Sequence, residues 1–257
     1  LHILKPGITW APDGETIAFS AKSGKSDALH TVNIITDEKK QYRLDMEGIF
    51  RPVWSPINNE IVFIGNNGKQ SDIYILDLTT EALINMTDDI YTDDHVSWSS
   101  DGKHLIFISD RGEKENQMDI FSISTKTHEI KQISNTHFDE GYPLYSNDPN
   151  QIVFIADEFG INNIYTQNLQ NAIREPLTNV MTGVSQLSWG ESNAHLLFSG
   201  FENSGYDIYV MKNPLDNTKK IEIPMTNWVN NEKLPMLKRK DRRAQNSSQS
   251  YINYTFS

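Results

Sequence analysis

The sequence has 257 residues, with 34 acidic and 23 basic side chains, a formal net charge of -11 and no cysteine. The absence of cysteine excludes disulfides, thiolate metal sites and cysteine nucleophiles. The acidic balance argues against a nucleic-acid partner, because phosphate contacts need clustered Lys and Arg, and no apolar stretch of about 18 residues is present to cross a membrane as a helix.

Aromatic residues recur along the chain with spacings of 44, 44, 47 and 44 residues. Each stands at the same point of a repeated phrase, and a Phe closes the phrase nine residues later. The aromatic positions are Trp10, Trp54, Trp98, Tyr145 and Trp189. A fixed period of about 40 to 50 residues is typical of solenoids, propellers or arrays. The chain is therefore a tandem repeat of five units.

Each repeat contains short runs of β-branched and aromatic residues bounded by Asp, Asn, Gly and Ser, which predict strands. No window keeps the apolar spacing of a helix for the required length. In chain order, strand a runs into the Trp, strand b ends at the Phe, strand c begins at an Asp-Ile-Tyr motif, and strand d runs into a Leu-Thr pair. Four short antiparallel strands per repeat predict an all-β protein, a β-propeller of four-stranded blades.

The repeats divide residues 1–226 into five blades at about 3–44, 45–88, 89–135, 136–178 and 179–226. Because the chain begins at strand a, no early strand is left to complete the last blade. The five repeats could close as a five-bladed ring, but we expect them to belong to a six-bladed one. Residues 227–257 carry a net charge of +4 and regain β-type composition only near their end. They are expected to be a basic linker and the start of a following β domain.

The recurring residues are expected to be structural anchors. A large aromatic in every repeat fills space between adjacent blades. An Asp at the start of strand c accepts backbone N–H groups, which gives local order without a further role. These anchors are Trp10, Trp54, Trp98, Tyr145 and Trp189, together with Asp72, Asp119 and Asp207.

Acidic residues that do not recur are concentrated in the connections from strand d to strand a. In a four-stranded meander these connections lie on the same face as the b-to-c loops. Carboxylates gathered there create a negative field that attracts cations or a basic protein segment. We predict that these connections form a rim that binds a protein or peptide partner, including one rich in basic residues. The rim residues are Asp88, Asp89, Asp93, Asp94, His95, His137, Asp139 and Glu140. The alternative is ordinary surface loops in an acidic protein.

The sequence contains no zinc-protease motif, nucleophile elbow or phosphate-binding glycine loop. Calcium binding by the first four rim aspartates is a further alternative, but their spacing is not that of a calcium loop. We therefore expect no metal, no cofactor and no catalysis within this chain. An enzyme that uses His95 or His137 with neighbouring carboxylates as acid and base is a minor alternative.

The repeat phrase resembles the Trp-Ser-Pro-Asp-Gly repeat of TolB-like propellers, over roughly residues 3–226. The closest copies are residues 10–14, 54–56 and 98–102, and residues 21–29, 47–50, 182–185 and 205–209 resemble one subgroup. In that subgroup of bacterial exported proteins, the propeller precedes an outer-membrane barrel of the surface-antigen type.

This resemblance implies a periplasmic or cell-envelope location and further blades before Leu1. Together with the recurring structural anchors and the absence of catalytic motifs, it predicts a non-catalytic interaction module. Similar repeats occur in prolyl-oligopeptidase-like and tricorn-like peptidases. The alternative function is therefore an accessory propeller that gates a catalytic domain outside this chain.

Overall fold

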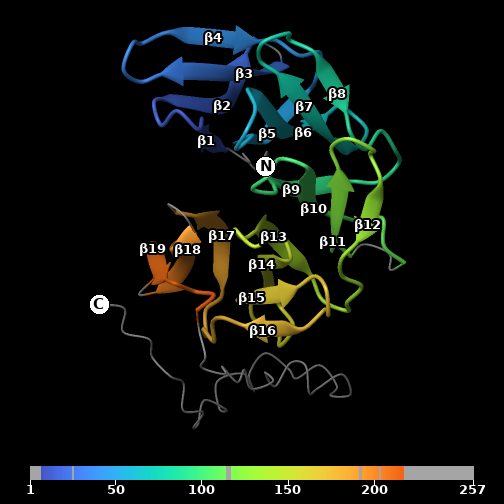
Figure 1. Ribbon diagram of the computed structural model, residues 1–257, viewed down its shortest axis with the longest axis vertical. Helices are drawn as coiled ribbons and strands as arrows, with labels where there is room; N and C mark the ends of the chain where they lie inside the picture. The colour runs from blue at the N-terminus through green and yellow to red at the C-terminus, as the bar shows by residue number, and fades with distance from the viewer. Residues whose placement is uncertain (1–6, 25, 114–116, 191–192, 203, 217–257) are drawn as a thin grey trace, which may run out of the picture.

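The computed structural model describes residues 7–216 except 25, 114–116, 191–192 and 203. These residues form antiparallel sheets arranged in chain order around a common centre (Figure 1). The prediction of an all-β propeller with four-stranded blades is confirmed, and the described residues form five blades. Within the described ranges, no helix is long and apolar enough to cross a membrane.

Each sheet begins at the centre of the ring and runs outward. The first sheet contains β1 (Ile8–Trp10), β2 (Thr16–Ser23), β3 (Ser26–Asn33) and β4 (Lys39–Tyr42). The second contains β5 (Gly48–Trp54), β6 (Glu60–Asn66), β7 (Ser71–Asp77) and β8 (Leu83–Asn85). The third contains β9 (Asp93–Trp98), β10 (His104–Ser109), β11 (Asp119–Ser124) and β12 (Ile130–Gln132).

The fourth sheet contains β13 (Glu140–Tyr145), β14 (Gln151–Ala156), β15 (Asn163–Asn168) and β16 (Arg174–Pro176). The fifth has three strands among the described residues, β17 (Val184–Trp189), β18 (His195–Glu202) and β19 (Gly205–Lys212). The expected fourth strand before Met225, and the expected linker at residues 227–257, lie outside the described residues.

Hydrophobic clusters join each sheet to the next. The Phe that closes each of the last four phrases lies in such a cluster, and Phe63, Phe107 and Phe154 are fully buried. The indole N–H of Trp98 donates to the carbonyl of Val53 in the preceding blade at 3.0 Å. The indole of Trp189 donates to the Tyr145 carbonyl at 2.8 Å in the same way. These indoles therefore join adjacent blades by packing and by a hydrogen bond.

In the second, third and fourth repeats, the hydroxyl residue of the Leu-Thr pair joins strand d to strand c by a hydrogen bond. The Thr87 hydroxyl accepts the backbone N–H of Ile73 at 3.0 Å, and the Thr178 hydroxyl accepts that of Ile164 at 2.9 Å. Ser134 does the same for Ile120 at 2.8 Å. Because a buried N–H without a partner costs free energy, these hydroxyls explain why the pair recurs.

The ring is open between its first and last described sheets (Figure 1). Neighbouring sheets contact each other extensively in chain order, but no such contacts join the first sheet to the fifth within the described ranges. Ile208 of β19 is 77% exposed, whereas its counterparts Ile73, Ile120 and Ile164 are fully buried. On the other side of the opening, Trp10 is 55% exposed, against 8% for Trp98.

Candidate functional site

Strand a of each later repeat contains a β-bulge at the same point. In β5, β9, β13 and β17, two residues lie opposite the single Phe of strand b. The first residue of each bulge has a positive φ, with values of 51° at Arg51, 52° at His95, 52° at Tyr142 and 59° at Gln186. A non-glycine residue in this region costs about 1 to 2 kcal/mol. The geometry is thus imposed by the ring at four equivalent positions.

Bulges of this kind often re-aim a side chain next to a functional site. Here the four bulge residues line a central cavity of about 1000 Å³, together with Gly7, which occupies the equivalent position of the first repeat. The blades repeat their anchors, but these five positions carry Gly, Arg, His, Tyr and Gln. The residue type therefore changes at the point where the strand faces the cavity.

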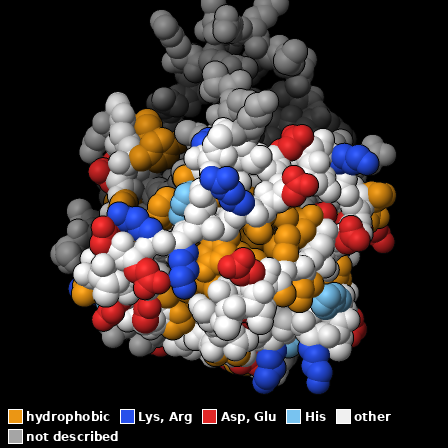
Figure 2. All heavy atoms as spheres, turned by 90° about the horizontal axis from the view of Figure 1, so that it is seen from above, with side chains coloured by type: hydrophobic (Ala, Val, Ile, Leu, Met, Phe, Trp, Pro, Cys, Tyr) orange, Lys and Arg blue, Asp and Glu red, His pale blue; other side chains and the backbone are white. Residues whose placement is uncertain are grey.

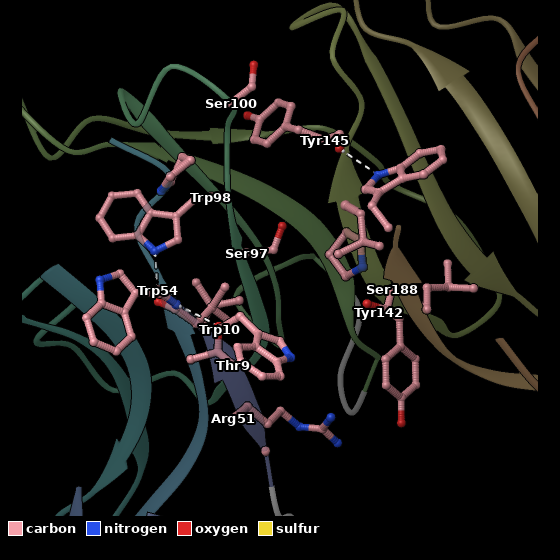
Figure 3. A pocket seen from close by; sticks show the side chains of 18 of the residues that line it. Thr9, Trp10, Arg51, Trp54, Ser97, Trp98, Ser100, Tyr142, Tyr145 and Ser188 are labelled. Atoms are coloured by element: carbon pink, nitrogen blue, oxygen red, sulfur yellow. Dashed lines mark hydrogen bonds between the residues drawn. The ribbon is translucent and has the colours of Figure 1, made fainter. Parts of the chain in front are cut away.

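Side chains from three consecutive blades converge in this cavity. The Arg51 guanidinium lies over the Tyr142 ring, 5.2 Å from its centroid, although their blades are not neighbours. The intervening blade supplies His95, whose ring centroid lies 3.9 Å from that of Tyr142. Figure 3 shows Arg51 extending toward Tyr142 across the cavity. The cluster exists only because the three bulges point to one centre.

Asp94 contacts the edge of the Arg51 guanidinium, in addition to the contact of Tyr142 with its face. Its Nε lies 3.0 Å from Oδ1 of Asp94. The N–H is not aligned with this oxygen, so the contact is an ion pair without a well-formed hydrogen bond. Asp94 Oδ1 also accepts the backbone N–H of His95 at 2.8 Å. Asp94 and Tyr142 thus position the guanidinium.

The rest of the cavity wall is aromatic and polar. Four indoles line it, and so do hydroxyl and amide side chains (Figure 3); the indoles belong to Trp10, Trp54, Trp98 and Trp189. Among the described residues that line the cavity, Arg51 carries the one permanent charge. Burial raises the pKa of Tyr145 to about 12, opposed by a hydrogen bond with Ser122, so its phenol is protonated at neutral pH.

The structure divides the predicted rim into buried and exposed residues. Asp93 is fully buried, and its Oδ1 accepts from Nη2 of Arg111 at 2.7 Å. The same guanidinium donates from Nη1 to Asp89 at 2.9 Å. Burial raises the pKa of Asp93, and the Arg111 charge opposes this shift. Arg111 thus neutralises carboxylates that the sequence suggested were free.

Glu140 is also buried, and its Oε1 accepts from Nη2 of Arg174 at 2.5 Å, while its Oε2 accepts from the Ser134 hydroxyl. Burial raises the pKa of Glu140, opposed by the charge of Arg174. Four rim carboxylates therefore lie in ion pairs within or between blades, namely Asp89, Asp93, Asp94 and Glu140. These pairs contribute little to an outward-facing field.

The remaining rim residues are more accessible. Asp88, His137 and Asp139 are exposed, and Asp89 is half-buried. On the face shown in Figure 2, acidic and basic side chains are interspersed around exposed hydrophobic side chains. In the described part of the chain, no group of three or more His, Asp or Glu side chains is arranged to hold a metal ion.

The strand-c anchors lie away from the cavity. Asp72 and Asp119 are buried, and Asp72 accepts from the Asn85 side chain at 3.1 Å. Asp119 accepts the backbone N–H of Thr136 at 3.3 Å. The third, Asp207, is exposed on β19 beside the open side of the ring.

The bulge residues other than His95 were missed at the sequence level. The available signal was the position three residues before each phrase aromatic, where residue type varies between otherwise similar repeats. Periodicity points to the positions that recur, and so it directs attention away from this one.

Comparisons with known proteins give the fold a family context. Residues 2–120 match the family model of the TolB beta propeller domain. A search of curated proteins gave no match. The chain thus contains TolB-like propeller repeats, and the match covers less than half of its length.

Solved structures agree with this fold. TolB from Acinetobacter baumannii superposes with a TM-score of 0.67 at 20% identity, over 81% of this chain and 51% of that chain. A protein assigned as TolB from Agrobacterium tumefaciens gives 0.70 at 17% identity, over 81% and 77%. A prolyl endopeptidase gives 0.57 at 14% identity, over 86% and 35%. This chain thus spans about half the length of the Acinetobacter protein.

Proposed function

We propose that this propeller is a non-catalytic interaction module of the bacterial envelope, which binds an extended segment of a partner protein at its central cavity. The observation that carries the proposal is the set of bulge residues. Five equivalent positions face one cavity and carry different residues, four of them in a strained conformation. Strained, non-repeating positions around a cavity are typical of binding sites.

The envelope location and the completed ring belong to the same proposal. The TolB-like repeats support the location. The open side supports a sixth blade, because Ile208 is exposed where its counterparts in three other blades are fully buried, and Trp10 is exposed whereas Trp98 is buried. The Trp-Ser-Pro-Asp-Gly phrase and the following outer-membrane barrel remain expectations from the family resemblance.

The exposed acidic residues of the predicted rim lead us to expect a positively charged partner. Asp88 and Asp139 are exposed in d-to-a connections, on the face of the propeller where the strands that line the cavity begin. Exposed carboxylates steer a basic segment toward this face. We therefore propose a partner segment that carries Lys or Arg, and we include His137 and Asp89 in the same surface.

An array of random octapeptides tests this function. The 257-residue chain is expected to retain a subset of peptides enriched in Lys and Arg. The double variant Asp88→Lys with Asp139→Lys should weaken their binding by about tenfold. A matched control, Glu38→Lys with Glu129→Lys, changes exposed acids in two c-to-d turns, outside both the predicted rim and the cavity lining. Failure of the wild-type chain to retain any peptide would refute the function.

A second function is favoured by one observation. The fold also matches a prolyl endopeptidase, although this chain spans only 35% of that protein. In this alternative the propeller gates access to a catalytic domain outside the chain. Peptide cleavage by the parent protein, lost when the sequence outside these 257 residues is removed, would favour gating over capture.

A further inference from the structure

We propose that Arg51 makes the cavity a site for a carboxylate group of the ligand. The inference rests on the proposed function and names the chemistry that the cavity recognises. Arg51 provides five N–H donors in a planar fork. None of them makes a well-aligned hydrogen bond to another described residue, and Nε is buried.

The other two ion-paired arginines of the described blades are used differently. Arg111 donates from Nε, Nη1 and Nη2 to Ser109, Asp89 and Asp93, and its side chain is 8% exposed. Arg174 donates to Glu140 and Gln167. Both have structural partners, whereas Arg51 lines the cavity with its side chain 23% exposed. Arg51 is thus held in place but retains its capacity to donate.

The surroundings of Arg51 fix its orientation before a ligand arrives. Asp94 lies at the Nε edge, and Tyr142 lies under the guanidinium face. A guanidinium fixed in this way loses little conformational freedom on binding, which favours affinity. The edge that carries Nη1 and Nη2 matches the two oxygens of a carboxylate.

The charge balance favours a carboxylate over a phosphate. Arg51 is the one permanent charge among the described cavity residues, and Asp94 already offsets part of it. A singly charged, planar anion matches one guanidinium fork, whereas a phosphate carries nearly twice the charge. Ser97 and Ser188 add hydroxyl donors to the wall of the same cavity.

Two sources supply this chemistry, a peptide with a free C-terminus and a small organic acid. The octapeptide array separates them when each peptide is made both as the free acid and as the C-terminal amide. We expect the acids to bind at least about tenfold more tightly, since a hydrogen bond to a charged group contributes about that much. N-acetylglycine and its amide, titrated against the fluorescence of the cavity indoles, test the small acid.

Substitutions of the two members of the Arg51–Asp94 ion pair should change the binding of acids in opposite directions. Arg51→Gln should remove the preference for acids, and Arg51→Lys should restore part of it. Asp94→Asn keeps the oxygen that accepts from His95 but removes the competing charge. It should tighten binding of the acids several-fold, a change that misfolding cannot produce. The matched control is Arg43→Gln, since Arg43 is exposed and outside the cavity; its binding of acids should match that of the wild-type chain.

Each outcome decides one of the two proposals. Peptides that bind equally as acid and amide, with no effect of Arg51→Gln, would overturn the carboxylate inference and leave the interaction function intact. Binding of N-acetylglycine alone, dependent on Arg51, would support the inference and overturn the peptide function. If neither peptides nor N-acetylglycine bind, both proposals are wrong.

Discussion

Two tryptophans at the same repeat position should respond very differently to replacement. Trp98 is 8% exposed and donates to the Val53 carbonyl of the preceding blade. Trp98→Ala removes both the packing and the hydrogen bond, and replacement of a buried Trp costs about 3 to 5 kcal/mol. Trp10 is 55% exposed at the open side of the ring. Trp10→Ala should therefore cost only about 1 kcal/mol, roughly half the value for burying an aromatic side chain.

The expected difference in stability between the two variants is large enough to measure by thermal unfolding. In a domain of this size, about 1 kcal/mol shifts Tm by roughly 2 to 4 °C. We expect Tm to fall by roughly 6 to 20 °C for Trp98→Ala and by less than about 5 °C for Trp10→Ala. Circular dichroism is the suitable assay, because fluorescence itself changes when a Trp is removed. Equal shifts in Tm for the two variants would refute the interpretation that Trp98 joins adjacent blades by packing and a hydrogen bond.

Three further predictions concern stability. Arg111→Leu leaves the buried Asp93 carboxylate unpaired and should cost about 3 to 5 kcal/mol in urea unfolding; adding Asp93→Asn should recover part of this loss. Thr87→Val leaves the Ile73 N–H without its acceptor and should cost about 1 to 3 kcal/mol, and no loss in urea unfolding would argue against this fastening. The pKa of Asp101 is lowered from 3.8 to about 2, chiefly by a hydrogen bond with a Ser hydroxyl. Its stabilisation is present above pH 3.8 and is lost as the pH falls toward 2. The free energy of unfolding of the wild-type chain should therefore approach that of Asp101→Asn as the pH falls from 3.8 to about 2.

The repeated part of the molecule was predictable because every blade needs the same kinds of residue at the same packing positions. A phrase Phe must fill the space between two sheets, and a phrase hydroxyl must accept a strand-c N–H. Such requirements recur with the blade, and so they leave a period in the sequence. This is why the five blades and their antiparallel strands could be predicted from residue spacing alone.

The site was less predictable because its contacts join distant segments. Arg111 reaches Asp93 from a b-to-c loop, and Arg174 reaches Glu140 from strand β16. Charge counting along the chain cannot show that these carboxylates have buried partners. The bulges are a second case, since a register shift in strand a is decided by packing around the ring. The outer part of the predicted rim remains a prediction.

The bulges also bear on how such a propeller changes over evolutionary time. A bulge residue is displaced from the regular strand ladder, so blade pairing does not depend on its side chain. A substitution at one bulge alters one sector of the cavity, while the phrase aromatics and hydroxyls continue to join the blades. Ligand preference can therefore diverge one sector at a time, without a new fold and without simultaneous changes in the other repeats.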